Sequence, residues 1–489
     1  MYLKHMAYYG LKLEECGKKD KRISNFILNT LSVLSSNYEI SPVNFKMIDS
    51  AFKTELPRVI KEFNEAYPEH EKHDIDSILK TDADLNDYIR YGEKEFNKRL
   101  QMLSDEERNF YMVLFILIKS LCINILTYES FGAKPEYEII LVYKLLNLLN
   151  TSSVQKEEIK KFVSEISEAD CNLMKKIRTL QEETYGKQEE KKVSFSTEKG
   201  KALLVVGSNI KELEMILDKF EGREIDIYTH DNMILAHTFP GFSKYKHLKG
   251  QYGQGMESCL LDFSTFPGPI ILTRYSLFNV ESLYRGILYT TDFSHSQGVI
   301  QIKNNDFSEV IKSAEKSRGF KTGKFCEPEK VGFSQSKIMS EVKRKMSDSK
   351  YRQIILTGIG GYSAEEKEYF KNFINHIPPD VLMVSLFCCE QKENVICINA
   401  ANDVFAMNML TDSIINTFNQ KITLIFPYSN RHTLSVIINS AKKDNVNVYV
   451  GKWASLFLEQ GIMECLKSEF GINEVTIPKK DINNMTDIK

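Results

Sequence analysis

The feature that most constrains the fold is a change of sequence pattern near residue 200. Two later segments, "KALLVVGSNIKELEMILDKF" from Lys201 and "RQIILTGIGGYSAEEKEYFKNFI" from Arg352, each place a short apolar run before a glycine turn and an amphipathic helix. Further apolar runs follow, in "EIDIYTH", "GPIILTRYS", "DVLMVSLFCC", "KITLIFPYSN" and "NVNVYVG". Strands that alternate with helices predict parallel sheets, so we expect two Rossmann-like α/β domains here.

The first part of the chain has a helical pattern instead. Apolar residues recur at three- and four-residue spacing in "SNFILNTLSVLSS" and "YEIILVYKLLNLLN", and the charged stretch 181–201 is expected to be an exposed connection. The prediction is a multidomain α + α/β protein with mainly parallel sheets. We expect a helical bundle domain over 1–195, a first Rossmann-like domain over 196–345 and a second over 346–489.

The charge and hydropathy of the chain are typical of a soluble globular protein. The 64 basic and 66 acidic residues nearly cancel, so the sequence carries no signal for nucleic acid or an anionic membrane surface. The most apolar segment, Phe110 to Tyr128, contains Lys119, Ser120 and Asn124 near its middle. A membrane span needs about 20 predominantly apolar residues, so a buried helix is the favoured interpretation.

Cysteine usage indicates the compartment. The nine cysteines are scattered, no Cys-x-x-Cys occurs, and the amino terminus lacks the apolar core of a secretion signal. We therefore expect a cytoplasmic protein with free thiols. A tight run of thiols that could hold a cubane iron–sulfur cluster is also missing from the amino-terminal region.

Ligands of parallel α/β sheets bind beyond the carboxyl ends of the strands, which identifies the positions of interest. These positions are Gly207 to Asn209, His230 to Asn232, Tyr275 to Ser276, Gly360 to Ser363, Cys388 to Cys389, and Tyr428 to Arg431.

Each motif among them has a functional and a structural interpretation. The glycine turn from Thr357 to Ser363 has amides for a phosphate, but a plain strand-to-helix turn is favoured because it lacks the full dinucleotide fingerprint. Cys388 and Cys389 could be thiolate ligands or reactive thiols, but core residues are favoured because buried cysteine is common in protein cores. Three histidines could bind metal, yet hydrogen-bonded structural histidines are favoured, because no cluster of carboxylates or cysteines accompanies His230, His237 and His247.

A family resemblance is carried by "YTHDNMILAH" with "FSKYKHLKGQYGQG", and by "FPGPIILTRYSL", "ILTGIGGYSAEEKEYF", "LMVSLFC" and "AANDVFA". In order and in most of their spacing these resemble the hybrid-cluster (prismane) proteins, relatives of carbon monoxide dehydrogenase, over residues 200–489. The resemblance implies an iron–sulfur–oxygen cluster between the domains, held by one histidine, two glutamates and four cysteines. The segment around Cys16 is similar to part of the family's amino-terminal cubane motif.

The resemblance also implies that most of these cluster ligands are lost. Cys388 keeps a family cysteine position, as a candidate metal ligand. The other positions are substituted: the family's histidine by Ser208, its glutamates by Asn232 and Ser429, and its cysteines by Ser276, Tyr362 and Ala401. Hydroxyl, amide, phenol and methyl groups lack the softness or the charge of thiolate and carboxylate.

Three hypotheses follow. The first is a degenerate family member, a pseudoenzyme without clusters or other cofactor, which acts as a binding or regulatory protein and whose old inter-domain cavity is refilled or holds a small ligand. The second is an oxidoreductase of the hydroxylamine or nitric oxide reductase type, with a rearranged iron–sulfur cluster on Cys388, Cys389, Cys397 and Cys326. The third is a nucleotide-binding module that uses the glycine turn at Thr357.

Overall fold

The computed structural model describes residues 2–35, 42–69, 86, 90, 93–94, 101, 103–148, 155–253, 259–274, 287–292, 298–347, 350–360, 363–387, 389–390, 392–427, 430–453 and 460–486. The chain separates into two compact units, the first formed mainly by residues 1–169 and the second mainly by residues 170–489. Both α/β halves belong to the second unit. The expected domain boundaries near residues 195 and 345 stay predictions.

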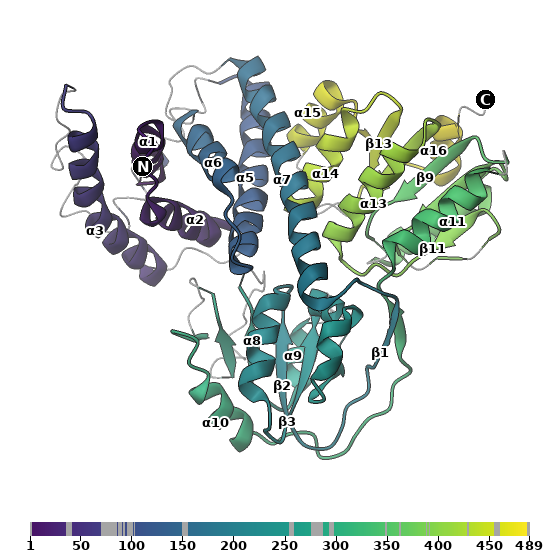
Figure 1. Ribbon diagram of the computed structural model, residues 1–489. Helices are drawn as coiled ribbons and strands as arrows, with labels where there is room; N and C mark the ends of the chain where they lie inside the picture. The colour runs from purple at the N-terminus through teal and green to yellow at the C-terminus, as the bar shows by residue number, and fades with distance from the viewer. Residues whose placement is uncertain are drawn as a thin grey trace. The chain divides into compact units, whose positions relative to one another are not determined.

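The first unit is helical, as expected (Figure 1). Glycine at position 10 lets two of its helices approach closely, because a Cβ there would lie 2.8 Å from Cε2 of Tyr143. Its described helices are α1 (Tyr2–Glu15), α2 (Lys21–Ser35), α3 (Pro42–Ala66), α5 (Asp105–Ser130) and α6 (Glu136–Leu148), and α7 (Lys156–Tyr185) begins in this unit and ends in the second.

Helix α5 contains the most apolar segment of the chain. It begins at a capping box, in which the Ser104 side chain accepts from the backbone N–H of Glu107 and the Glu107 side chain accepts from the backbone N–H of Ser104. Among the described helices it alone is long and apolar enough to cross a membrane, but 72% of the apolar window is buried within the protein. This agrees with the prediction of a buried helix.

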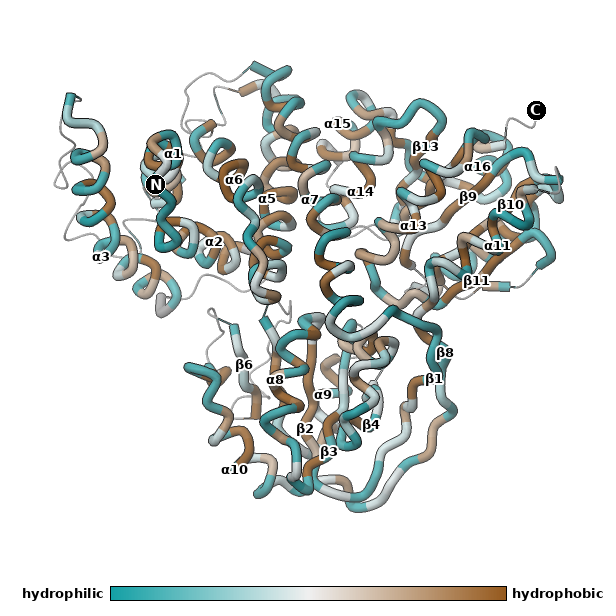
Figure 2. The backbone as a smooth tube through the Cα atoms, viewed as in Figure 1, coloured by the Kyte–Doolittle hydropathy of each residue, from teal (hydrophilic) through white to brown (hydrophobic). Residues whose placement is uncertain are grey.

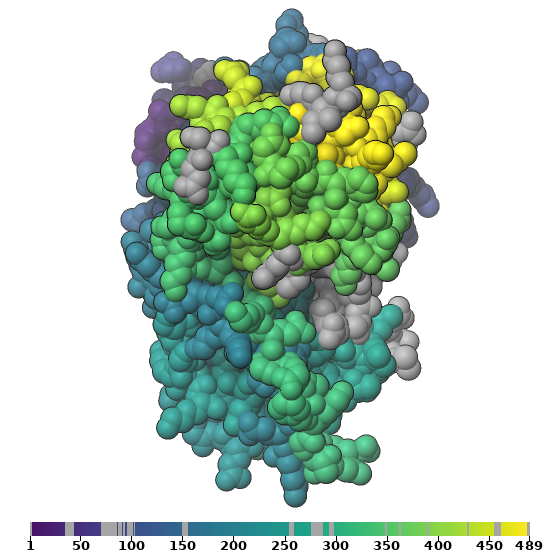
Figure 3. All heavy atoms as spheres, turned by 90° about the vertical axis from the view of Figure 1, so that its right-hand side faces the viewer, coloured from purple at the N-terminus to yellow at the C-terminus, as the bar shows by residue number. Residues whose placement is uncertain are grey.

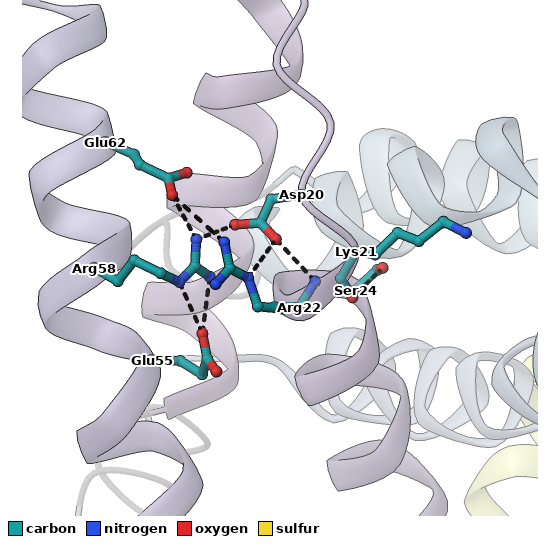
Figure 4. A network of polar contacts seen from close by, with 7 residues as sticks. All are labelled: Asp20, Lys21, Arg22, Ser24, Glu55, Arg58 and Glu62. Atoms are coloured by element: carbon teal, nitrogen blue, oxygen red, sulfur yellow. Dashed lines mark hydrogen bonds and ion pairs between the residues drawn. The ribbon is translucent and has the colours of Figure 1, made fainter.

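A network of charged side chains joins α2 to α3 (Figure 4). The guanidinium of Arg58 bonds to Asp20, to Glu62 at 2.7 Å and to Glu55 at 2.8 Å. Burial opposes ionisation of Asp20, but hydrogen bonds from the Arg22 N–H and from Arg58 outweigh it and lower the pKa of this carboxyl. The network therefore stabilises the pairing of the two helices at neutral pH.

The first sheet of the second unit has six parallel strands in the order β4-β3-β2-β5-β6-β7. This is the strand order of a Rossmann fold, so the prediction of a Rossmann-like sheet is confirmed. Its strands are β2 (Lys201–Val206), β3 (Ile225–His230), β4 (Leu248–Gln251), β5 (Ile270–Leu272), β6 (Leu288–Thr290) and β7 (Ile300–Gln301). The helical segments between them are α8 (Ile210–Phe220), η1 (Asp231–Thr238), η2 (Pro240–Lys244) and α9 (Cys259–Thr265), and α10 (Ser308–Lys316) follows β7.

The second sheet repeats this arrangement, with parallel strands in the order β11-β10-β9-β12-β13-β14. Its strands are β9 (Gln353–Thr357), β10 (Val381–Ser385), β11 (Val395–Cys397), β12 (Lys421–Phe426), β13 (Val446–Val450) and β14 (Asn473–Glu474). The accompanying helices are α11 (Gln335–Ser347), α12 (Ala364–His376), α13 (Val404–Thr417), α14 (Arg431–Ala441), α15 (Gln460–Phe470) and α16 (Pro478–Thr486). The central strands are apolar and buried, and Figure 2 shows β2 and β3 of the first sheet as brown tubes.

Two short strands lie outside the six-stranded sheets and pair with each other. Strand β1 (Lys191–Val193) pairs antiparallel with β8 (Glu329–Val331). The segment that leads into β8 lies on the surface of the second unit, where its green spheres are visible in Figure 3. Phe325 in this segment is 76% exposed.

Candidate functional site

The carboxyl end of β2 carries the turn that holds Ser208. This residue is exposed, and Asn209 after it caps α8 by accepting from the backbone N–H of Glu212 at 3.2 Å. The carboxylate of Glu212 accepts from the Arg274 N–H at 3.0 Å and from the Thr291 hydroxyl at 2.5 Å. It thus binds residues that follow β5 and β6, which a local capping pattern does not reveal.

Glu212 and Arg274 occupy the point where the strand order of the first sheet reverses. The Arg274 Nε lies 2.9 Å from the Glu212 carboxylate and 3.3 Å from the Thr291 carbonyl. Burial raises the pKa of Glu212, although Arg274 acts against that rise. Dinucleotides usually bind at such a point, and here it holds the ion pair of Glu212 with Arg274.

The three histidines of the stretch from residue 227 to 255 are bonded to protein groups. The His230 Nε2 lies 3.0 Å from Asp262 Oδ2, and the His237 Nε2 lies 3.0 Å from the Thr229 hydroxyl. The His247 Nε2 lies 3.0 Å from the carbonyl of residue 217. The hydrogen bonds expected of structural histidines are therefore present. Within the described part of the chain, no three His, Cys, Asp or Glu side chains gather as a metal site would require.

Burial also controls the ionisation of this stretch. It lowers the pKa of His237 to about 4, and the positive charge of Lys191 contributes to the same shift. It raises the pKa of the Asp231 carboxyl to about 6, against the opposing influence of His230. Asp231 has a left-handed backbone with φ of 58°, and Asn232 next to it is partly buried in η1. Position 232 therefore offers a neutral amide, next in sequence to a carboxyl whose pKa burial raises to about 6.

Ala401 lies in an apolar environment. Its backbone is left-handed, with φ of 47°. Its side chain packs against a buried cluster of Val193, Ile234 and Val331, which come from β1, η1 and β8. The methyl group at this position is therefore part of a small core that joins three segments of the second unit.

Two residues after Ala401, a buried ion pair appears that the sequence did not predict. Asp403 caps α13, pairs with Arg178 from α7 and accepts from the Gln188 amide at 2.9 Å. The same Gln188 amide lies 3.1 Å from the hydroxyl of Thr238 at the end of η1. An aspartate before a helix is a common N-cap, so the local sequence could have indicated the capping role of Asp403, but it does not identify the basic partner.

The remaining carried-over positions, Ser276, Tyr362, Cys388 and Ser429, lie outside the described residues. Their neighbour Cys389 forms a disulfide with Cys397, so the expectation that all cysteines are free thiols was wrong for this pair. The error arose because sequence separation does not show that the ends of β10 and β11 bring these two residues together.

Cys326, a further thiol of the second hypothesis, is free and lies in the segment between α10 and β8. Its backbone N–H donates to the Ser196 hydroxyl at 3.0 Å. The described contacts do not bring Cys326 together with the Cys389–Cys397 pair.

The sequence matches a family model and is similar to several known proteins. The model of the Prismane/CO dehydrogenase family matches residues 7–401. A hydroxylamine reductase from Methanocella arvoryzae is 23% identical over 431 residues, which cover 84% of this chain and 79% of that protein. A hydroxylamine reductase from Thermotoga petrophila is 24% identical over 371 residues, which cover 72% of this chain and 86% of that protein.

The solved structures give a likeness of fold. The alpha subunit of an acetyl-CoA synthase/carbon monoxide dehydrogenase, described with NiZn[Fe4S4] and NiNi[Fe4S4] clusters, aligns with 99% of this chain and 81% of its own. The TM-score is 0.50 and the sequence identity 9%. Two parallel six-stranded sheets in a mixed helical and α/β chain agree with this neighbour.

Proposed function

Because the chain belongs to the Prismane/CO dehydrogenase family, we propose that it keeps the family fold without the cluster chemistry and acts as a binding or regulatory protein. The observation that carries this proposal is Ala401. At a position where the resemblance implies a cysteine ligand, its methyl group packs against Val193, Ile234 and Val331. A methyl group cannot coordinate iron. Where the resemblance implies a sulfur ligand, this chain has an apolar group that packs in a small core.

The donor set as a whole does not fit a multi-iron cluster at the carried-over positions. Iron–sulfur clusters are held mainly by thiolates. The described positions offer an exposed hydroxyl at Ser208, an amide at Asn232 and a methyl at Ala401. Among the positions outside the described residues, Cys388 alone keeps a thiol. We therefore derive no catalytic step through such a cluster.

The second candidate is a hydroxylamine reductase-type oxidoreductase. The names of the relatives from Methanocella and Thermotoga favour it, and Cys389 and Cys397 do converge, as a rearranged ligand set requires. Against it, these two sulfurs are bonded to each other, so they could bind iron only after reduction, because the thiolate is the ligand form. Among the described residues, no third His, Cys, Asp or Glu side chain gathers with them as a metal site would require.

The third candidate, nucleotide binding at the glycine turn, has less support. A Cβ built on Gly360 would lie 2.3 Å from Oε1 of Glu366, so a buried carboxylate borders this turn. A phosphate would meet its negative charge. A small ligand in the old inter-domain cavity and a cytoplasmic location, by contrast, remain part of our proposal.

Metal analysis of protein purified without oxygen tests the first two candidates. We expect iron and acid-labile sulfide far below one atom per chain, and no reduction of hydroxylamine by a reduced viologen dye. The hydroxylamine reductase of Thermotoga petrophila, prepared in parallel, controls for loss of cluster during purification. Stoichiometric iron and sulfide, both lost on Cys388→Ala, would overturn the proposal and establish the oxidoreductase.

A further inference from the structure

We propose that Cys389 and Cys397 form a reversible thiol–disulfide exchange site, which reacts with small thiols and whose oxidised form braces the segment 398–403. The inference does not depend on the proposed function. It rests on where the two sulfurs lie, on their partial exposure and on what the chain does directly after Cys397.

The pair lies at the carboxyl edge of the second sheet. Strand β11 is the outermost strand on its side, and Cys397 is its last residue, in register with Ser385 at the end of β10. Cys389 follows β10 by four residues and is joined to Cys397 by the disulfide. The bond thus ties the segment after an inner strand to the end of an edge strand.

The exposure of the pair differs from that of the structural thiols. Cys389 and Cys397 pack on one side against the buried cluster that includes Phe387 and Val395, yet both keep part of their surface exposed. By contrast, Cys465 in the same half of the second unit is buried. Exchange requires a thiolate to approach a disulfide sulfur, and partial exposure permits this approach.

The structure also accommodates the reduced form. The Cys397 Sγ lies 3.3 Å from the carbonyl oxygen of Cys389, an acceptor that the Cys397 thiol can use after the disulfide opens. Reduction therefore leaves a hydrogen bond in place of the covalent bond. The two redox states differ mainly in how firmly the two segments are held together.

The segment after Cys397 contacts two parts of the second unit. The N–H of Ile398 donates to Ser385 at 2.9 Å, and the carbonyl of Asn399 accepts from Gly332, next to β8, at 2.8 Å. The segment continues through Ala401, whose backbone is left-handed, and ends at Asp403, which pairs with Arg178. A covalent bond directly before this segment limits its motion, so the redox state of the pair controls how firmly it is held.

The chemistry balances with thiols as the reductant. A thiolate attacks one sulfur, forming a mixed disulfide and releasing the other cysteine as a thiolate, and a second thiol then resolves the mixed disulfide. Two thiols are thereby oxidised to one disulfide, while the Cys389–Cys397 bond takes up two electrons and two protons. Hydrogen peroxide reverses the reaction through a sulfenic acid, releasing two water molecules in total.

The test uses full-length protein equilibrated in glutathione buffers of graded redox potential, then trapped with a maleimide and digested. We expect a peptide that links Cys389 to Cys397 under oxidising conditions, and simultaneous labelling of both residues under reducing conditions. Cys397→Ser should abolish the linked peptide in every buffer and leave Cys389 either labelled by the maleimide or joined to glutathione, whereas Cys465→Ser should leave the transition unchanged.

Hydrogen exchange measures the structural consequence. We expect amides in 398–403 to exchange several-fold faster in reduced than in oxidised wild type, and Cys397→Ser to match the reduced rate in both buffers. Because the comparison within wild type needs no substitution, misfolding of a variant cannot decide it. Absence of the linked peptide, a link between Cys388 and Cys397, or equal exchange rates in both states would overturn the proposal.

Discussion

The buried pair of Arg178 and Asp403 permits a quantitative test. The two side chains are 3% and 2% exposed, although they come from helices far apart in sequence. Replacing Arg178 by methionine keeps an unbranched apolar chain but removes the charge that faces Asp403. The carboxylate would then be buried without a cation, and breaking a buried pair in this way usually costs about 3–5 kcal/mol.

The structure places the expected cost at the lower end of that range. Asp403 would keep two donors, the Gln188 amide at 2.9 Å and the Ala406 N–H at 2.9 Å. We therefore expect Arg178→Met to lower the free energy of unfolding by about 3 kcal/mol. In wild type the Nε and Nη1 of Arg178 have no hydrogen-bond partner among the described residues. The pair is thus imperfect, and Arg178→Met with Asp403→Asn should come within about 1 kcal/mol of wild type.

Urea unfolding followed by tryptophan fluorescence measures these differences. The chain has 1 tryptophan, Trp453, which packs against Tyr369 in the second unit. Lys175→Met is the matched control, because Lys175 pairs at 2.9 Å with Asp412 through side chains that are 31% and 35% exposed. Such a pair contributes about 0–1 kcal/mol. If Arg178→Met costs no more than Lys175→Met, the buried-pair reasoning is refuted.

Three further outcomes are expected. Burial lowers the pKa of His237 to about 4, so the unfolded chain binds the proton first and stability should fall as the pH drops from 6.5 to 4. Urea titrations should show that His237→Gln removes about 2–3 kcal/mol of that fall. A Cβ on Gly250 would lie 2.2 Å from the Ser194 carbonyl, so Gly250→Ala should cost about 2–3 kcal/mol by urea unfolding, against about 1 kcal/mol for unobstructed Gly222→Ala. Arg58→Met should lower the melting temperature of the first unit, and the loss should shrink at high salt because part of its ion-pair network is exposed to solvent.

The two parallel sheets could be predicted because their signals are local. A buried strand, a glycine turn and a capped helix are each encoded within a few residues, as the caps at Asn209 and Ser363 confirm. Right-handed crossovers then leave few topologies for such a series of units. The class of fold was accessible from the sequence for this reason.

The polar interior could not be predicted in the same way. Arg178 and Asp403 are separated by 225 residues, and Glu212 meets the Thr291 hydroxyl across 79. Neither separation along the sequence produces a periodic pattern. The polar groups that meet in the interior are therefore visible only in the assembled fold. The disulfide of Cys389 was missed for a related reason: its partner becomes a neighbour only when β11 pairs with β10.

Asp231 and Ala401 have a left-handed backbone that L-residues seldom adopt, as do Asn304 and Asn305 among the described residues. Such a conformation costs about 1–2 kcal/mol, which glycine avoids. At Ala401 the packing of the methyl group offsets this cost by about 0.8 kcal/mol. Ala401→Gly should therefore change the free energy of unfolding by less than about 1 kcal/mol. Asp231→Gly should stabilise the protein, and more so at pH 8 than at pH 4, because it also removes a carboxyl whose pKa burial raises to about 6.

Urea unfolding at pH 8 and pH 4 tests whether the side chains at these two positions stabilise the left-handed backbone or contribute nothing to it. In wild type the cost of ionising Asp231 is present above its folded pKa of about 6 and disappears below its usual value. The difference between wild type and Asp231→Gly should follow that titration. A variant that is less stable than wild type at pH 8 would mean that the ionised carboxylate makes favourable contacts. The positive φ at Asp231 would then be explained by those contacts of the carboxylate.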